Sequence, residues 1–192
     1  MPPPRWLEAL ESRAPDVVAA WRVCDVSLLA LRHELRARAG SGTAAAIDRQ
    51  QEAVGDALSD ALDAANEEHL RAPGGEGDWN VAQAFAHTTA SRRWLAHAAA
   101  LTARGEWPDE EPVVRPGIPG PEDASRELLR TYLDKSRRSL ALSAEAIAGH
   151  ETDPCPLDHP LVGHLRCGEW LLFAGVHDLM HLEQLHRLMG DA

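Results

Sequence analysis

The chain has 192 residues, of which 26% are charged and 44% are hydrophobic, and its formal net charge is −11. This composition is typical of a globular protein, whereas the acidic balance argues against a nucleic-acid groove or adsorption to an anionic membrane, both of which need clustered Lys and Arg. The sequence contains no run of 18 apolar residues, so we expect neither a membrane span nor a membrane partner.

The cysteines and the N-terminal sequence bear on the compartment. Cys24, Cys155 and Cys167 are an odd number of cysteines, and none belongs to a CxxC pair. The first residues also lack the apolar stretch of a signal peptide. These features predict a cytoplasmic protein whose thiols are reduced.

Helical patterns dominate the chain, because Ala and Leu are abundant and no stretch alternates polar and apolar residues as a strand should. We expect a break near Pro15, a capping box made by Asn80 and Gln83, and a helix start at Glu122-Asp123. The expected helices cover residues 5–39, 43–70, 79–104, 122–148 and 166–190. The segment 105–121 is expected to be irregular, and the segment 150–163, with three prolines, is not expected to be helical throughout.

The sequence therefore predicts an all-α protein. Residues 1–42 form an N-terminal helical extension, and residues 43–192 form a four-helix bundle that makes one compact domain with it. Functional sites in such bundles are built from inward-facing side chains on neighbouring helices.

The last predicted helix carries polar residues on a face that should be buried. An α-helix turns about 100° per residue, so His177 and His181, four residues apart, point to the same side as Trp170 and Phe173. Burying a polar group without a partner costs about 1–3 kcal/mol. A metal ion would satisfy both imidazoles, and so would hydrogen bonds in a core or a wet groove.

A metal site of the catalytic type uses three protein ligands. His87 is the natural third ligand, because it lies in mid-helix on the inward face of the predicted helix 79–104. His97, on the same helix, is expected to face solvent. Trp94 and Trp170, which share faces with the histidines, are expected to be core residues rather than substrate walls.

Three motifs resemble those of the DinB-like (DinB/YfiT) superfamily. They are Trp79-Asn-Val-Ala-Gln-Ala-Phe-Ala-His87, the segment His159-Pro-Leu-Val-Gly163, and Glu169-Trp-Leu-Leu-Phe followed by His177-x-x-x-His181-x-x-Gln184. The resemblance covers about residues 43–189, and residues 1–42 are not part of the usual pattern.

The resemblance implies a four-helix bundle of DinB/YfiT type with a metal at one end, held by the residues here numbered His87, His177 and His181. It also implies a small-molecule substrate, because relatives include transferases that use low-molecular-weight thiols and proteins assigned as metal-dependent hydrolases. Dimers are common among relatives, so we expect a homodimer.

Three neutral imidazoles favour Zn²⁺ or Ni²⁺ and leave open positions. Water activated there would make a hydrolase, whereas a thiol bound as thiolate would make a thiol S-transferase. Gln184 lies close to His177 on the helical wheel, where it would orient water or a histidine or would hydrogen-bond another helix. A protein that binds metal or ligand without catalysis, or serves as a dimerisation module, is the alternative.

Two other metal chemistries are disfavoured. His177-Asp-Leu-Met-His181 has Asp178 where the HExxH metalloproteases have Glu, and Asp178 is expected on the polar side of the helix. A di-iron bundle needs two ExxH motifs and two further Glu residues, and only Glu183-Gln-Leu-His186 fits.

Overall fold

The computed structural model describes residues 4–41, 43–74, 79–110, 112–115 and 117–190. Within these ranges it contains eight helices and one short hairpin, which confirms the predicted helical bundle. The elements are α1 (Arg5–Glu11), α2 (Pro15–Trp21), α3 (Leu28–Ser41), α4 (Ala44–Ala64), α5 (Glu67–Arg71), α6 (Val81–Ala103), α7 (Arg126–Ile147), β1 (Pro154–His159), β2 (Gly163–Arg166) and α8 (Cys167–Met189). None of these helices is long and apolar enough to cross a membrane.

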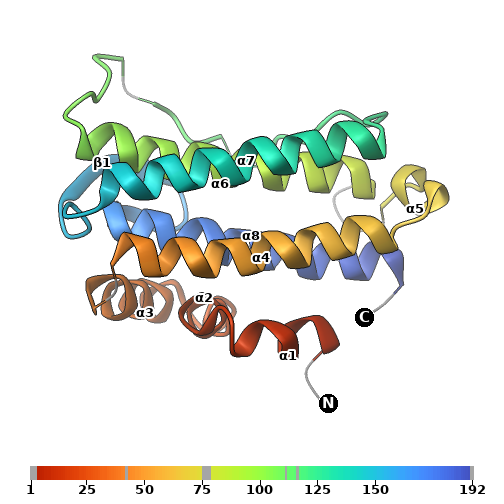
Figure 1. Ribbon diagram of the computed structural model, residues 1–192, viewed down its shortest axis with the longest axis horizontal. Helices are drawn as coiled ribbons and strands as arrows, with labels where there is room; N and C mark the ends of the chain where they lie inside the picture. The colour runs from red at the N-terminus through yellow and green to blue at the C-terminus, as the bar shows by residue number, and fades with distance from the viewer. Residues whose placement is uncertain (1–3, 42, 75–78, 111, 116, 191–192) are drawn as a thin grey trace.

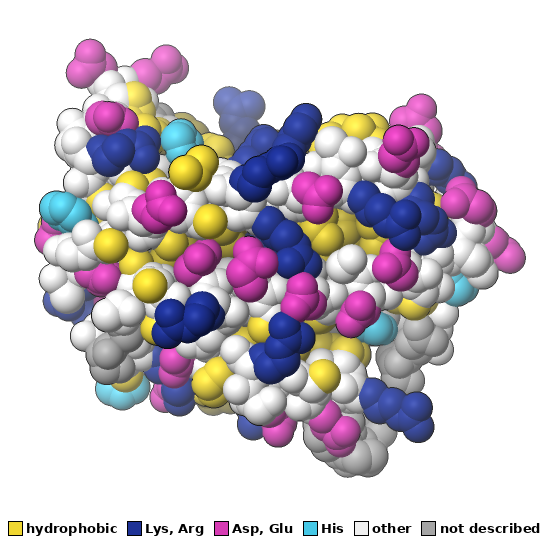
Figure 2. All heavy atoms as spheres, in the orientation of Figure 1, with side chains coloured by type: hydrophobic (Ala, Val, Ile, Leu, Met, Phe, Trp, Pro, Cys, Tyr) yellow, Lys and Arg dark blue, Asp and Glu magenta, His cyan; other side chains and the backbone are white. Residues whose placement is uncertain are grey.

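Four long helices make the bundle. α6 and α7 form one layer, α4 and α8 form the next, and α6 packs against both α7 and α8 (Figure 1). The face shown in Figure 2 carries acidic and basic side chains interspersed, without a broad area of either sign. The largest fully buried side chains include Trp170, Phe85 and Leu58, so one continuous core joins α4, α6 and α8.

The N-terminal segment is three helices: the break expected near Pro15 occurs, and a second break, which was not expected, separates α2 from α3. Pro15 occupies the first turn of α2, where the missing N–H is harmless, and it drives Ala14 out of the helical region to φ −135° and ψ 53°. α2 ends at Trp21, and Ser27 accepts a hydrogen bond from the Ala30 amide where α3 begins. α2 and α3 pack along α8 (Figure 1).

Close approach of helices fixes the position of the N-terminal segment. A Cβ on Gly175 of α8 would lie 3.0 Å from Val17 Cγ1 of α2 and 2.8 Å from Gln51 Nε2 of α4. Val17 and Leu35 are fully buried. Helix α3 continues to Ser41, two residues beyond the predicted end at residue 39, and Gly42 lies outside the described residues.

Two of the predicted boundaries in the bundle are wrong. The expected helix 43–70 breaks at Ala65–Asn66, because the Asn66 side chain accepts a hydrogen bond from the His69 amide and starts α5. α7 begins at Arg126, capped by Ser125, so the expected pairing of Glu122-Asp123 with the helix dipole does not occur.

The segment 150–163 contains no helix, in agreement with the expectation, but it includes a strand that was not expected. β1 and β2 form an antiparallel hairpin that leads directly into α8. Cys155, Leu157 and His159 alternate inward along β1. The prolines at 154, 156 and 160 conceal this alternation in the sequence, because proline is disfavoured in central strands but is tolerated in edge strands.

Candidate metal centre

Three histidines from two helices converge at one place in the bundle. His87 comes from α6, and His177 and His181 lie one turn apart on α8. One ligand atom from each residue lies within 4.8 Å of the others. Among the described residues, this is the one group of three or more His, Cys, Asp or Glu side chains arranged to hold a metal ion.

The starts of α6 and α8 fix the register of the histidines. Asn80 Oδ1 accepts a hydrogen bond from the Gln83 amide at 2.8 Å, and Gln83 Oε1 accepts one from the Asn80 amide at 3.0 Å. This confirms the predicted capping box. α8 starts in a similar way, since the Glu169 carboxylate accepts a hydrogen bond from the Arg166 amide at 3.0 Å.

Two imidazoles are oriented by hydrogen bonds from Nδ1. His87 Nδ1 donates to the Ile118 carbonyl at 2.7 Å, and His181 Nδ1 donates to Gln184 Oε1 at 2.8 Å. A neutral imidazole has one N–H, so each of these bonds leaves Nε2 with a lone pair. Metal-binding histidines typically make this kind of outer bond, which fixes the tautomer and the ring orientation.

The third ring shows why a cation fits the cluster. The Nε2 atoms of His177 and His181 lie 3.3 Å apart, and His177 Nδ1 is buried without a hydrogen-bond partner. Without a metal, a proton on His177 Nε2 allows that atom to donate a hydrogen bond to the lone pair of His181 Nε2. The neutral His177 ring then has no proton on Nδ1, and this buried nitrogen has no hydrogen-bond partner. Two nitrogens bound to one tetrahedral metal at 2.0–2.1 Å would be about 3.3–3.4 Å apart, so the spacing suits a shared ion.

Burial keeps all three imidazoles uncharged at neutral pH. It lowers the pKa of His177 well below the ordinary 6.5, and the neighbouring His181 and His87 add to this effect. Burial lowers the pKa of His181 to about 4, although the hydrogen bond to Gln184 opposes the shift. It also lowers the pKa of His87, against the opposing bond to Ile118. Neutral imidazoles are the protonation state that binds a metal.

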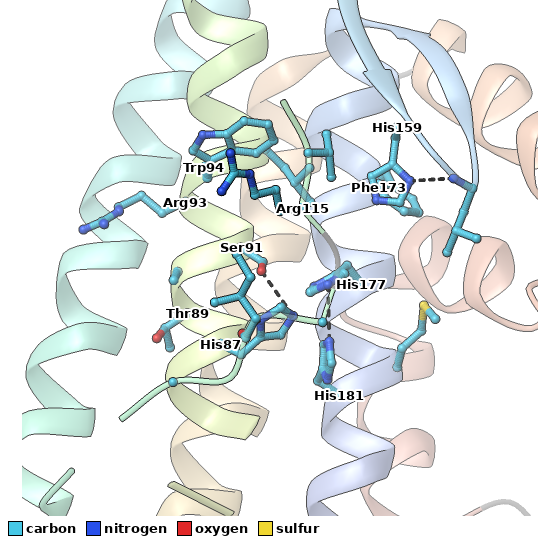
Figure 3. A pocket seen from close by; sticks show the side chains of 18 of the residues that line it. His87, Thr89, Ser91, Arg93, Trp94, Arg115, His159, Phe173, His177 and His181 are labelled. Atoms are coloured by element: carbon cyan, nitrogen blue, oxygen red, sulfur yellow. Dashed lines mark hydrogen bonds between the residues drawn. The ribbon is translucent and has the colours of Figure 1, made fainter. Parts of the chain in front are cut away.

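The histidines border a cavity of about 970 Å³, which is large enough for a small organic molecule (Figure 3). Each histidine is half-buried, and His177 lines the cavity although its Nδ1 is enclosed. Trp79 covers one side of the cluster, with ring centroids 4.9 Å from His87 and 6.4 Å from His181.

The segment between α6 and α7 forms a wall of the cavity. Val113, Val114 and Ile118 line it. Gly120 fastens this segment to α6, because its amide donates to the Gln83 carbonyl at 3.2 Å. A Cβ on Gly120 would lie 2.4 Å from that of Ala86, so a larger residue cannot approach as closely.

Several residues near the site differ from expectation. Asp178 is fully buried rather than on the polar side: its Oδ2 lies 2.8 Å from Arg92 Nε in an ion pair inside the bundle. The side of α8 that carries Asp178 is also packed against the bundle. A helical wheel that assumes one solvent-exposed face therefore placed Asp178 wrongly. Trp170 is a core residue as expected, whereas Trp94 is half-buried and lines the cavity. His97 is exposed, as expected.

Sequence reasoning missed other cavity residues. His159 reaches the cavity from β1, with its Nδ1 accepting a hydrogen bond from the Leu161 amide at 3.1 Å. Its place in the motif His159-Pro-Leu-Val-Gly163 was the available signal. Arg93 and Arg115 also line the cavity. No sequence signal distinguishes them from other surface arginines.

A bundle with three histidines facing a cavity defines a class of helical proteins with a candidate metal site between their helices. Residues 50–185 match the family model of the DinB superfamily, and the chain belongs to this superfamily. Comparison with curated proteins and with solved structures gave no match.

Proposed function

We propose that His87, His177 and His181 hold a divalent transition metal, Zn²⁺ or Ni²⁺, and that the protein is an enzyme acting on a small molecule. The observation that carries this proposal is the convergence of the three imidazoles, with ligand atoms within 4.8 Å, beside a cavity of about 970 Å³. Three protein ligands and an adjoining cavity are typical of catalytic rather than structural metal sites.

The reaction class follows from what such a site supplies. A bound divalent ion provides Lewis-acid activation of a nucleophile, either water or a thiol. The chain's own residues orient the ligand rings through Ile118 and Gln184 and enclose the substrate between α6, α8 and the segment before α7. We therefore propose a metal-dependent hydrolase or a low-molecular-weight-thiol S-transferase.

The alternative is a protein that binds metal or ligand without catalysis. The cavity beside the histidines favours the enzyme, because a purely structural site is closed by a fourth protein ligand. The described residues provide three such ligands and no fourth.

We also propose a cytoplasmic location and a homodimer. The free thiols of Cys24, Cys155 and Cys167 support a reducing compartment, since Cys155 and Cys167 share a hydrogen bond without being joined. Val26, just before α3, and Leu29, in its first turn, have exposed side chains that offer an apolar surface for a second copy. Light scattering on wild-type protein and a Leu29→Glu variant tests the dimer, which the variant should weaken.

The deciding experiment for the metal centre is metal content by mass spectrometry on protein purified without a histidine tag. We expect about one transition metal per chain, lost in His87→Ala and in His181→Ala. His97→Ala is the matched control, because His97 is exposed on the same helix as His87. Absence of metal from the wild type after incubation with Zn²⁺ and Ni²⁺ would refute the metalloenzyme.

Incubation of the metal-loaded protein with a thiol and an electrophile then separates the two reaction classes. Consumption of the thiol that stops on chelation supports the transferase. Hydrolysis of esters or amides without thiol consumption supports the hydrolase. Failure of both reactions over a broad panel favours the non-catalytic alternative.

A further inference from the structure

The cavity has two chemically different ends. The three histidines occupy one end, and Trp94, Arg93 and Arg115 lie toward the other (Figure 3). Lys135 and Tyr132, three residues apart on α7, also line the cavity. Three cations therefore border a cavity in a protein whose net charge is −11.

Among the described residues, no carboxylate neutralises these cations. Arg93, Arg115 and Lys135 are exposed, and none forms an ion pair with a carboxylate in the described part of the chain. Neighbouring surface arginines differ, since Arg137 on α7 contacts both Glu52 and Asp56. Asp25 is the one carboxylate among the described residues that line the cavity.

The distance between the two ends sets the length of a ligand that would reach both. Arg93 follows His87 by six residues on α6 and Trp94 follows it by seven. A helix rises about 1.5 Å per residue, so the cationic end lies about 9–10 Å along α6 from the histidines. This length corresponds to a molecule with a body of several bonded atoms between its two functional ends.

The wall between the two ends is mainly apolar. The apolar lining includes Trp94 of α6, Val114 of the segment before α7, Val162 of the hairpin turn and Phe173 of α8. Apolar side chains of this kind bind the body of a ligand, whereas a few polar groups fix its orientation. Guanidinium and ammonium groups bind carboxylate, sulfonate or phosphate through charge-assisted hydrogen bonds.

We propose that the cavity binds an organic anion with an apolar body. Its anionic group lies at Arg93, Arg115 and Lys135, and its reactive part reaches the three histidines. This inference rests on the proposed function for the identity of the reactive end, because the histidine cluster defines that end. The anion-binding end stands on separate residues and is tested separately.

The test compares two fluorescent probes that share an apolar body. 8-Anilinonaphthalene-1-sulfonate carries a sulfonate, and N-phenyl-1-naphthylamine is its neutral counterpart. In the triple variant Arg93→Gln, Arg115→Gln, Lys135→Gln we expect the Kd of the sulfonate probe to rise about tenfold or more, since bonds to charged groups are lost. The Kd of the neutral probe should stay within about twofold, because the apolar wall is unchanged.

Two control variants locate the effect. Arg138→Gln removes an exposed cation that is one turn along α7 from Lys135 and does not line the cavity, so both Kd values should be unchanged. Trp94→Ala should weaken both probes, since it removes part of the apolar wall. If circular dichroism shows that the triple variant is unfolded, the single variants Arg115→Gln and Lys135→Gln replace it, and each should raise only the Kd of the sulfonate probe.

The proposal is overturned if the variants leave the Kd of the sulfonate probe within twofold of wild type, or if they raise both Kd values equally. Metal content is measured on the same preparations and should be unchanged in the cation variants. A protein without metal that still distinguishes the probes would refute the metal centre and leave the anion-binding end standing. A metal-containing protein that does not distinguish the probes would refute the anion-binding end and leave the metal centre standing.

Discussion

The imidazole of His87 donates a hydrogen bond from Nδ1 to the backbone carbonyl of Ile118 at 2.7 Å. Ile118 belongs to the segment that leads from α6 to α7, so a residue 31 positions away fixes the tautomer of the candidate ligand. This bond couples one wall of the cavity to the candidate metal centre.

Gly120 holds the segment of Ile118 against α6. In Gly120→Val, the new Cβ would lie 2.4 Å from that of Ala86 and 2.9 Å from the Gln83 carbonyl oxygen, so the segment must move away. We expect the affinity for Zn²⁺ to fall about 10–100-fold, the usual effect of losing an outer partner of a ligand histidine. Competition with a chelating dye measures it. Gly40→Ala, where a Cβ meets nothing within 4 Å, should leave the affinity unchanged.

Gln184 positions His181 through its Oε1, 2.8 Å from Nδ1. Gln184→Ala removes the acceptor and should weaken Zn²⁺ binding about 10–100-fold while leaving the fold intact. Gln184→Glu keeps an acceptor at the same place and should retain most of the affinity. Glu183→Ala, on the neighbouring residue, serves as the control. Equal affinities in wild type and Gln184→Ala would show that the bond does not support the metal centre.

The ion pair of Asp178 and Arg92 connects the bundle helices. Arg92 also donates to the Gln51 carbonyl at 3.1 Å, and both members of the pair are fully buried. Burial raises the pKa of Asp178 to about 7, and Arg92 opposes that rise. Asp178→Ala leaves the buried guanidinium without its partner, so we expect the free energy of unfolding to fall by about 3–5 kcal/mol.

Urea denaturation measures the loss for Asp178→Ala. The double variant Arg92→Met, Asp178→Leu should recover most of it, because no uncompensated charge remains. Arg130→Ala breaks the exposed pair with Asp63 and should cost at most about 1 kcal/mol. A loss of similar size in Asp178→Ala and Arg130→Ala would contradict the prediction.

The N-terminal helices are expected to unfold together with the bundle. Leu35 of α3 is fully buried in the same core as α8. Leu35→Ala should lower the free energy of unfolding by about 2–5 kcal/mol in a single transition observed by circular dichroism and by tryptophan fluorescence. Leu142→Ala, at a position on α7 that is 65% exposed, should have little effect. Two separate transitions would show that residues before α4 form an independent unit.

The sequence predicted the bundle because helical periodicity is local. The pattern of apolar residues and the capping box at Asn80 placed α6 within a residue or two of its actual start. It also placed His87, His177 and His181 on inward faces, where the structure brings them together.

Features that depend on contacts between distant segments could not be read from the sequence. A helical wheel placed Asp178 on a polar face, because it cannot show that α6 supplies Arg92 on that side. The hairpin before α8 depends on the pairing of β1 with β2, and its prolines concealed the inward alternation of Cys155, Leu157 and His159.

The sequence by itself determined the helical class, the single core and the three histidines, since each depends on residue type and spacing along one helix. Only the tertiary structure decided which side chains surround them. Ile118 and Arg115 come from a segment without regular structure, and its position depends on the close contact of Gly120 with α6. That contact depends on the shapes of two surfaces distant in sequence, so no local pattern encodes it.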